Sequence, residues 1–163
     1  MKKESRQLDE QLLSKQLLEV IPEIADEYFK FIKDNSNANF TEEDIAELRE
    51  LEALYGLSST SPGVTLAFES VLVPKIVEMS QNSKSRDELM RIFDWIEKMA
   101  QDEQFAVRNL VAGSICTPLI TTYSPALPSI RPHMGKATAK LCKMQFSAYR
   151  ITEQTQKLFE NAM

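Results

Sequence analysis

Apolar residues recur at intervals of three and four along most of the chain, which predicts helices rather than strands. The clearest stretch is residues 85–119, where one apolar stripe is formed by Leu89, Ile92, Phe93, Ile96 and Met99 or Ala100. Ser85 and Glu88 have the spacing of a capping box at the start of this helix. Asp102 interrupts the pattern and suits the N-cap of a second helix. We expect two antiparallel helices with a short turn.

The second helix of this pair is apolar on more than one face, so it is expected to be central and buried. Its apolar and small residues are Phe105, Val107, Leu110, Val111, Gly113, Ser114 and Ile115. A proline-rich stretch follows at residues 118–135 and predicts a long connector with at most one short helical turn.

Similar stripes predict further helices over residues 7–20, 22–34, 41–55, 64–79 and 136–160. Pro22 suits a first helical turn, and Gly56 suits the end of a helix. Pro74 lacks a backbone donor, so it is expected to kink or split its helix near residues 71–73. Because no stretch is typical of a strand, the predicted fold is all-α, a compact stack of antiparallel helix pairs.

The composition fits one soluble domain over residues 1–163, with 43% apolar residues and no apolar run of 18. The N-terminal residues turn polar and acidic at once and lack the apolar core of a signal peptide. We therefore expect a cytoplasmic protein. Cys116 and Cys142 lie in apolar helical patterns, so buried free thiols are favoured over a disulfide.

The net charge of −5 is unevenly distributed, being −7 over residues 1–60 and +4 over residues 131–163. The densest acidic run is Glu42, Glu43, Asp44, Glu47 and Glu50, followed by Glu52. Such a run is typical of a solvated helix face or of a docking surface for a basic partner. The basic set Arg131, Lys136, Lys140, Lys143 and Arg150 has few interleaved aromatics, which argues against nucleic-acid binding.

Candidate chemistry is sparse. His133 is the single histidine, and we expect it to pack on or cap the following helix rather than to act in catalysis. A thiol paired with His133 is the alternative. No Cys-x-x-Cys pair suggests zinc and no glycine-rich motif suggests a phosphate cradle, so no metal, cofactor or enzymatic activity is expected.

Residues 88–119 resemble the core of a family of small helical domains. Its pattern is an apolar "RIFDFIE-x-(M/L)-A" helix, an acidic turn and a "V-x-N-x-L-x-x-S-(V/I)" helix, which Arg91–Ala100 and Val107–Ile115 match. Residues 22–28 and 68–79 are similar to two further blocks, and residues 133–138, HMGKAT, are similar to the family's "MGP-x-T" helix start. Such domains resemble the immunity proteins of bacterial contact-dependent growth inhibition and polymorphic toxin systems.

That resemblance implies a non-enzymatic protein that occludes a cognate toxin domain, for example a nuclease. The partner is expected to be basic and to dock on Glu42, Glu43, Asp44, Glu47 and Glu50. The alternative is a HEAT-like adaptor, because Asp102 and Arg108 resemble the start of the second helix of a HEAT repeat. In that motif the acidic residue caps and the arginine reaches back across the turn, which implies a short α-solenoid.

Overall fold

The computed structural model describes residues 10–34 and 67–162. All regular elements in these residues are helical, with no strand among them, which confirms the all-α fold. One compact unit spans Asp9–Leu72 and the other contains Val73–Met163. A single folding domain over residues 1–163, and the arrangement of helix pairs as a solenoid, stay predictions.

The N-terminal unit is built from α1 (Glu10–Val20), the short 3₁₀ helix η2 (Pro22–Ile24) and α2 (Ala25–Asp34). Pro22 begins the new helical turn, as predicted, because a first-turn residue needs no amide donor. Among the apolar residues of these helices, Leu17, Ile21, Ile24 and Tyr28 are fully buried. The helix predicted over residues 41–55 lies outside the described residues.

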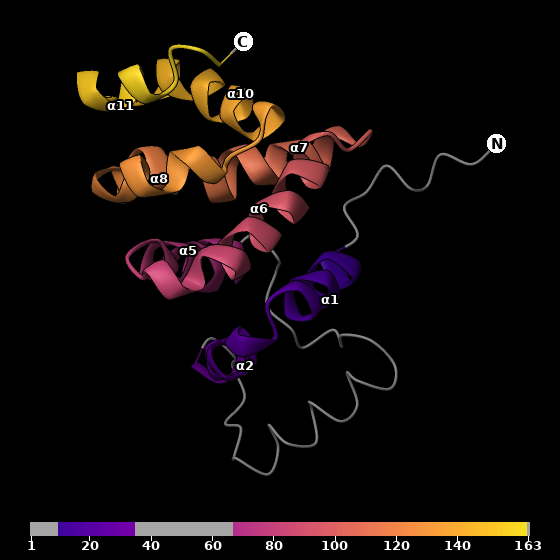
Figure 1. Cartoon of the computed structure of the whole chain (residues 1–163). Coiled ribbons are helices and arrows are strands. Elements are labelled where there is room, and N and C mark those ends of the chain that lie inside the picture. The colour runs from indigo at the N-terminus through magenta and orange to yellow at the C-terminus, as the bar shows by residue number, and fades with distance from the viewer. Residues whose placement is uncertain (1–9, 35–66, 163) are drawn as a thin grey trace, which may run out of the picture. The chain divides into compact units, whose positions relative to one another are not determined.

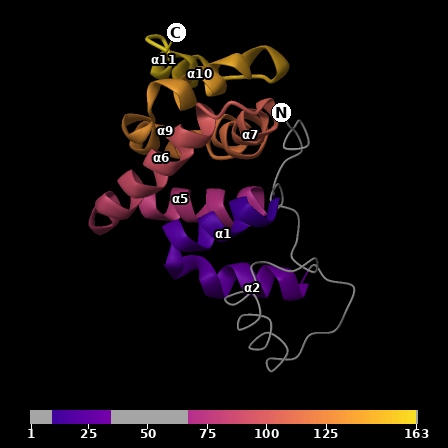
Figure 2. The ribbon, with the colours of Figure 1, turned by 90° about the vertical axis from the view of Figure 1, so that its right-hand side faces the viewer.

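The C-terminal unit contains α5 (Val73–Ser80), η4 (Ser83–Ser85), α6 (Arg86–Ala100) and α7 (Phe105–Leu110), followed by eight short helical elements up to Leu158. Figures 1 and 2 show three layers in this unit. α10 and α11 lie on one side, α7 to α9 in the middle and α5 on the other side, while α6 runs obliquely and packs against α5, α7 and α10.

The stripe predicted on α6 forms the core of this unit, since Leu89, Ile92, Phe93, Ile96, Met99 and Ala100 are all buried. Burial of the second helix is also confirmed for Val107, Leu110, Val111, Ser114 and Ile115, whereas Arg108 is half-buried and Asn109 and Gly113 are exposed. Phe105 is a clear error of the prediction, because its side chain is 70% exposed. It stands in the first turn of α7, where Arg108 lies 5.7 Å from the centre of its ring.

Of the two helix caps predicted in this region, Ser85 is the N-cap residue of α6 but makes no capping box, and Asp102 is not the N-cap of α7. Ser85 closes the 3₁₀ turn η4 with φ −94° and ψ 12°, and its side chain makes no cap hydrogen bond. Glu88 does not complete a capping box, and its buried Oε2 has no hydrogen-bond partner. Asp102 Oδ1 accepts from Gln104 N at 2.8 Å, which makes a turn before α7, while Gln104 is the N-cap.

Two π-helical turns precede prolines. η3 (Phe68–Leu72) leads into α5, and η5 (Val111–Cys116) leads into α8 (Thr117–Ile120). In both, the proline stands two residues after the π-helical turn, at Pro74 and Pro118. A proline removes a donor and crowds the carbonyl four residues earlier, so a wider turn accommodates it. The helix thus continues through residues 67–80 with a π-helical turn at the place where a kink or split was predicted, so a split near residues 71–73 is not seen.

The predicted connector over residues 118–135 is wrong, because this stretch is largely helical. Its pieces after α8 are η6 (Ser124–Ala126), α9 (Leu127–Ile130) and η7 (Arg131–His133), each with a proline among its first two residues. Proline ends one helix but also fits the first turn of the next. A dense series of prolines therefore yields successive short helices.

The single helix predicted over residues 136–160 is also interrupted. It consists of α10 (Lys136–Met144), η8 (Phe146–Ala148) and α11 (Glu153–Leu158). Thr152 starts α11 as its N-cap, since its Oγ1 accepts from Thr155 N at 3.2 Å. A threonine in this role competes with continued helix because its hydroxyl satisfies a backbone donor.

Within the described part of the chain, no single helix is long and apolar enough to cross a membrane. One pair, Phe105–Ile120 with Ser124–His133, reaches that length and composition only across an 84° bend.

Candidate binding site

The first turn of α10 is capped by a residue from another helix. Glu97, near the end of α6, accepts hydrogen bonds from Ala137 N at 2.8 Å and from Thr138 N at 2.9 Å. The Thr138 hydroxyl donates to the same carboxylate at 2.7 Å, and the Gln101 side-chain amide donates at 3.0 Å. These backbone donors are among the four that a helix leaves unpaired at its start. Glu97 thus ties α6 to α10.

Gly135 makes this approach possible. It is the N-cap of α10 and has no side chain with which to cap the helix itself. A Cβ at this position would lie 2.3 Å from Glu97 Cδ and 2.4 Å from Glu97 Oε1. Its φ of −78° and ψ of 174° are open to any residue. The requirement for glycine is therefore steric and comes from the carboxylate.

The ionised form of Glu97 is favoured. Burial by itself would raise its pKa, but hydrogen bonds from the Thr138 and Ala137 backbone, then from the Thr138 and Gln101 side chains, lower the pKa below its ordinary value. The positive end of the α10 helix dipole acts in the same direction. The cap is thus present at neutral pH and is lost only on acidification.

His133, the last residue of η7, packs against α6. Its ring stacks on Phe93, with centroids 6.4 Å apart and an interplanar angle of 22°. Burial, and then the positive charge of Arg86, lower the pKa of His133 below its ordinary value. His133 therefore packs, but its ring contact is with Phe93 of α6 and not with the following helix as predicted.

The two cysteines are free and buried, as predicted. Cys116 Sγ donates to the Thr138 carbonyl oxygen at 3.7 Å, which joins η5 to α10. Burial raises the pKa of the Cys116 thiol well above its ordinary value, and the nearby Cys142 thiol adds to the effect. A thiol held protonated in this way is a poor nucleophile.

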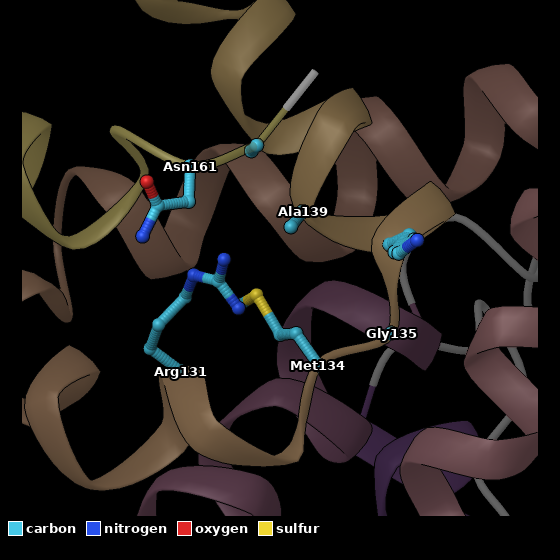
Figure 3. Close-up of a pocket in the computed structure, with 7 residues that line it drawn as sticks. Arg131, Met134, Gly135, Ala139 and Asn161 are labelled. Carbon is cyan, nitrogen blue, oxygen red and sulfur yellow. The ribbon is translucent and has the colours of Figure 1, made fainter.

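A pocket of about 240 Å³ opens beside the start of α10. Its polar lining comes from Arg131, Lys136 and Asn161, and its apolar wall from Met134, Ala139 and Ala162, with the backbone of Gly135 between them. Figure 3 shows Arg131 reaching into the pocket from η7, with Asn161 facing it from the segment after α11.

Arg131 is held in place at the pocket. Its Nε donates to the Leu158 carbonyl oxygen at 2.9 Å, and its guanidinium carbon lies 5.0 Å from the centre of the Phe159 ring. The segment opposite is held by Lys143, whose Nζ donates to the Ala162 carbonyl oxygen at 2.9 Å. Both walls of the pocket are thus fixed by side chains that bond to the last helical turn and the residues after it.

Glu42, Glu43, Asp44, Glu47 and Glu50 lie outside the described residues. Of the basic set, only Arg131 and Lys136 line the pocket, whereas Lys140, Lys143 and Arg150 are exposed elsewhere. Among the described residues, no group of three or more histidine, cysteine or acidic side chains is arranged to hold a metal ion.

The fold and the pocket define a small helical domain in which the partly buried carboxylate of Glu97 on α6 holds the start of α10. The chain belongs to the family described as a domain of unknown function (DUF7674), whose model matches residues 14–148. No curated protein and no solved structure matches the chain.

The matched range contains Glu97, Gly135 and Thr138. Asn161 and Ala162, on one wall of the pocket, follow the matched range. The pocket was not predicted from the sequence, because Arg131 and Asn161, which line it from two sides, are thirty positions apart. One signal in the sequence was the "MGKAT" start of α10. A glycine at the N-cap position has no side chain to cap the helix, which indicates an acceptor from elsewhere in the chain.

Proposed function

We propose that the chain is an immunity protein that binds a cognate bacterial toxin domain, for example a nuclease, and occludes its active site. Supporting this is the resemblance of residues 88–119 and 133–138 to such proteins. The observation that carries the proposal is that Glu97 joins these two blocks into one hydrogen-bonded framework. A prearranged framework suits inhibition by occlusion, because little ordering is needed on binding.

In this proposal the protein acts in the cytoplasm without a cofactor, a metal or a catalytic residue. His133 and the cysteines have packing roles that account for their positions. The docking surface is the acidic run Glu42, Glu43, Asp44, Glu47 and Glu50. A run of this charge steers a basic partner and raises the rate of association.

A second candidate is a HEAT-like protein-binding adaptor. The observation that favours it is Arg108, whose Nη1 donates to the carbonyl oxygens of Asp102 at 2.6 Å and Glu103 at 3.0 Å. This is the backward reach across the turn that the HEAT motif implies. The two candidates differ in what they bind, a toxin domain or a regulatory partner.

The proposal is tested first by growth. The product of the gene immediately upstream is expressed alone and then together with this chain. An immunity protein restores growth that the upstream product arrests, and His133→Gln leaves this protection intact. Arrest that the chain does not relieve would contradict the proposal, and arrest relieved by wild type but not by a folded His133→Gln protein would favour the enzymatic alternative.

The docking surface is tested by association rates. Reversal of Glu43, Glu47 and Glu50 to lysine is expected to slow association with the toxin about tenfold at low salt and less at high salt. The matched control reverses Glu103, Glu153 and Glu160, which are exposed acids of the C-terminal unit. Equal slowing by both sets would show a general charge effect and no docking by the acidic run.

A further inference from the structure

We infer that the pocket beside α10 is a binding site for a small organic anion, with a carboxylate or phosphate head and a short apolar body. This site is independent of the proposed toxin-docking surface. It is formed by residues 131–139 on one side and by Asn161 and Ala162 on the other.

The first reason is the charge of the pocket. Arg131 and Lys136 both line it, and neither forms an ion pair with an acid in the described part of the chain. The positive charge at the pocket is therefore not neutralised by an acid of the described residues and favours an anionic ligand. Glu97, the carboxylate at the start of α10, does not line the pocket and already accepts from α10 and Gln101.

The second reason is the orientation of Arg131. Its Nε donates to the Leu158 carbonyl oxygen, and its guanidinium lies over the Phe159 ring. The two terminal nitrogens of the side chain are therefore left for a ligand. A planar pair of donors matches the two oxygens of a carboxylate or phosphate. Because the guanidinium is already fixed, little side-chain entropy is lost when an anion binds.

The third reason is the composition of the remaining wall. Met134, Ala139 and Ala162 provide apolar surface beside the two cations, and Asn161 provides an amide. A volume of about 240 Å³ is several times the ~30 Å³ that one water occupies in the liquid. The pocket therefore has room for a head group and a few carbon atoms.

The test is a chemical-shift titration of the full-length, isotope-labelled chain with acetate, butyrate and inorganic phosphate at constant ionic strength. Binding is expected to shift the amides of residues 131–139 and 161–162, with a dissociation constant on the order of 1 mM because two charged contacts provide the affinity. Butyrate is expected to bind several-fold tighter than acetate, because its extra methylenes reach the apolar wall.

Lys136→Gln and Lys140→Gln are the matched variants. Both lysines are exposed on α10 one turn apart, but only Lys136 lines the pocket. Lys136→Gln is expected to weaken binding about tenfold, whereas Lys140→Gln should change it less than about twofold. Arg131→Lys, compared with Arg150→Lys, tests the planar donor pair. Should Arg131→Lys fail to fold, the lysine pair still decides the outcome.

The three anions also distinguish the source of the ligand. Tighter binding of butyrate than of phosphate at these amides assigns a carboxylate ligand, and the reverse order assigns a phosphorylated one. Absence of localised shifts with all three anions would overturn the inference. Equal weakening by Lys136→Gln and Lys140→Gln would overturn it as well, because it would show diffuse attraction to the basic face.

Discussion

The starts of α6 and α10 differ in how their first turns are capped. At α6 the sequence contains a capping-box pattern, yet Ser85 makes no side-chain cap bond and Glu88 Oε2 has no partner. At α10 the N-cap is a glycine, yet three donors of the first turn are satisfied by Glu97. A local pattern is thus neither sufficient for a cap nor necessary for one, since a tertiary contact can replace it.

The largest loss of stability is expected from a change at Phe93, because this residue lies on α6 in the core and stacks on His133 just before α10. Its side chain is 1% exposed, so Phe93→Ala should lower the free energy of unfolding by about 3–5 kcal/mol. Urea denaturation measures this. A loss below about 1 kcal/mol would mean that the α6 stripe is not the core.

Glu97→Ala should have the next largest effect. It leaves the Ala137 and Thr138 amides and the Thr138 hydroxyl without their acceptor, and a loss of about 2 kcal/mol is expected. Glu103→Ala is the control, since its side chain is exposed and in the nearby turn. Equal losses in the two variants would show that the cap contributes nothing specific.

Acidification should weaken the C-terminal unit in two separate pH windows. His133 and Glu97 both have lowered pKa values in the folded chain, so the unfolded chain binds more protons and stability falls as pH decreases. The His133 contribution is complete above its ordinary value of 6.5 and declines below it. The Glu97 contribution is complete above 4.5 and declines below that value.

Thermal unfolding between pH 7.5 and 3 measures both windows, with the range chosen to span the ordinary values of histidine and glutamate. His133→Gln should remove the decline in the upper window and leave the lower one. Glu97→Gln should do the reverse. A profile that His133→Gln leaves unchanged would assign the upper window to another group.

The smallest effects should come from the local caps. Thr152→Ala removes a side chain that accepts from Thr155 N and should lower the free energy of unfolding by about 1 kcal/mol. Ser85→Ala removes no such bond and should change it by less than about 0.5 kcal/mol. A larger loss from Ser85→Ala than from Thr152→Ala would reverse the assignment of the two caps.

Periodicity predicted most of the fold and little of the candidate site. The stripes of α1, α2 and α6 were found because each helix buries one regular face. The short helices after Pro118 were missed because the prolines of this stretch were interpreted as helix ends, although proline also starts helices, as predicted at Pro22. The break before α11 was missed because the apolar spacing continues across it while Thr152 starts a new helix.

The pocket and the Glu97 cap depend on contacts between residues far apart in the chain. Glu97 lies forty positions from Ala137, and Arg131 donates to Leu158 twenty-seven positions later. No local pattern contains such a pair. His133 was expected to pack on the following helix, and its actual partner Phe93 lies forty positions earlier in the chain.

The central claim is that Gly135 is required because Glu97 occupies the space of its missing side chain. A double-mutant cycle of Gly135→Ala and Glu97→Ala tests this by urea denaturation. In the wild-type background Gly135→Ala should cost about 2 kcal/mol, because it displaces the cap. In the Glu97→Ala background the clashing atoms are gone, so the same change should be neutral or stabilise by about 0.4–1 kcal/mol. An equal cost of Gly135→Ala in both backgrounds would contradict the account.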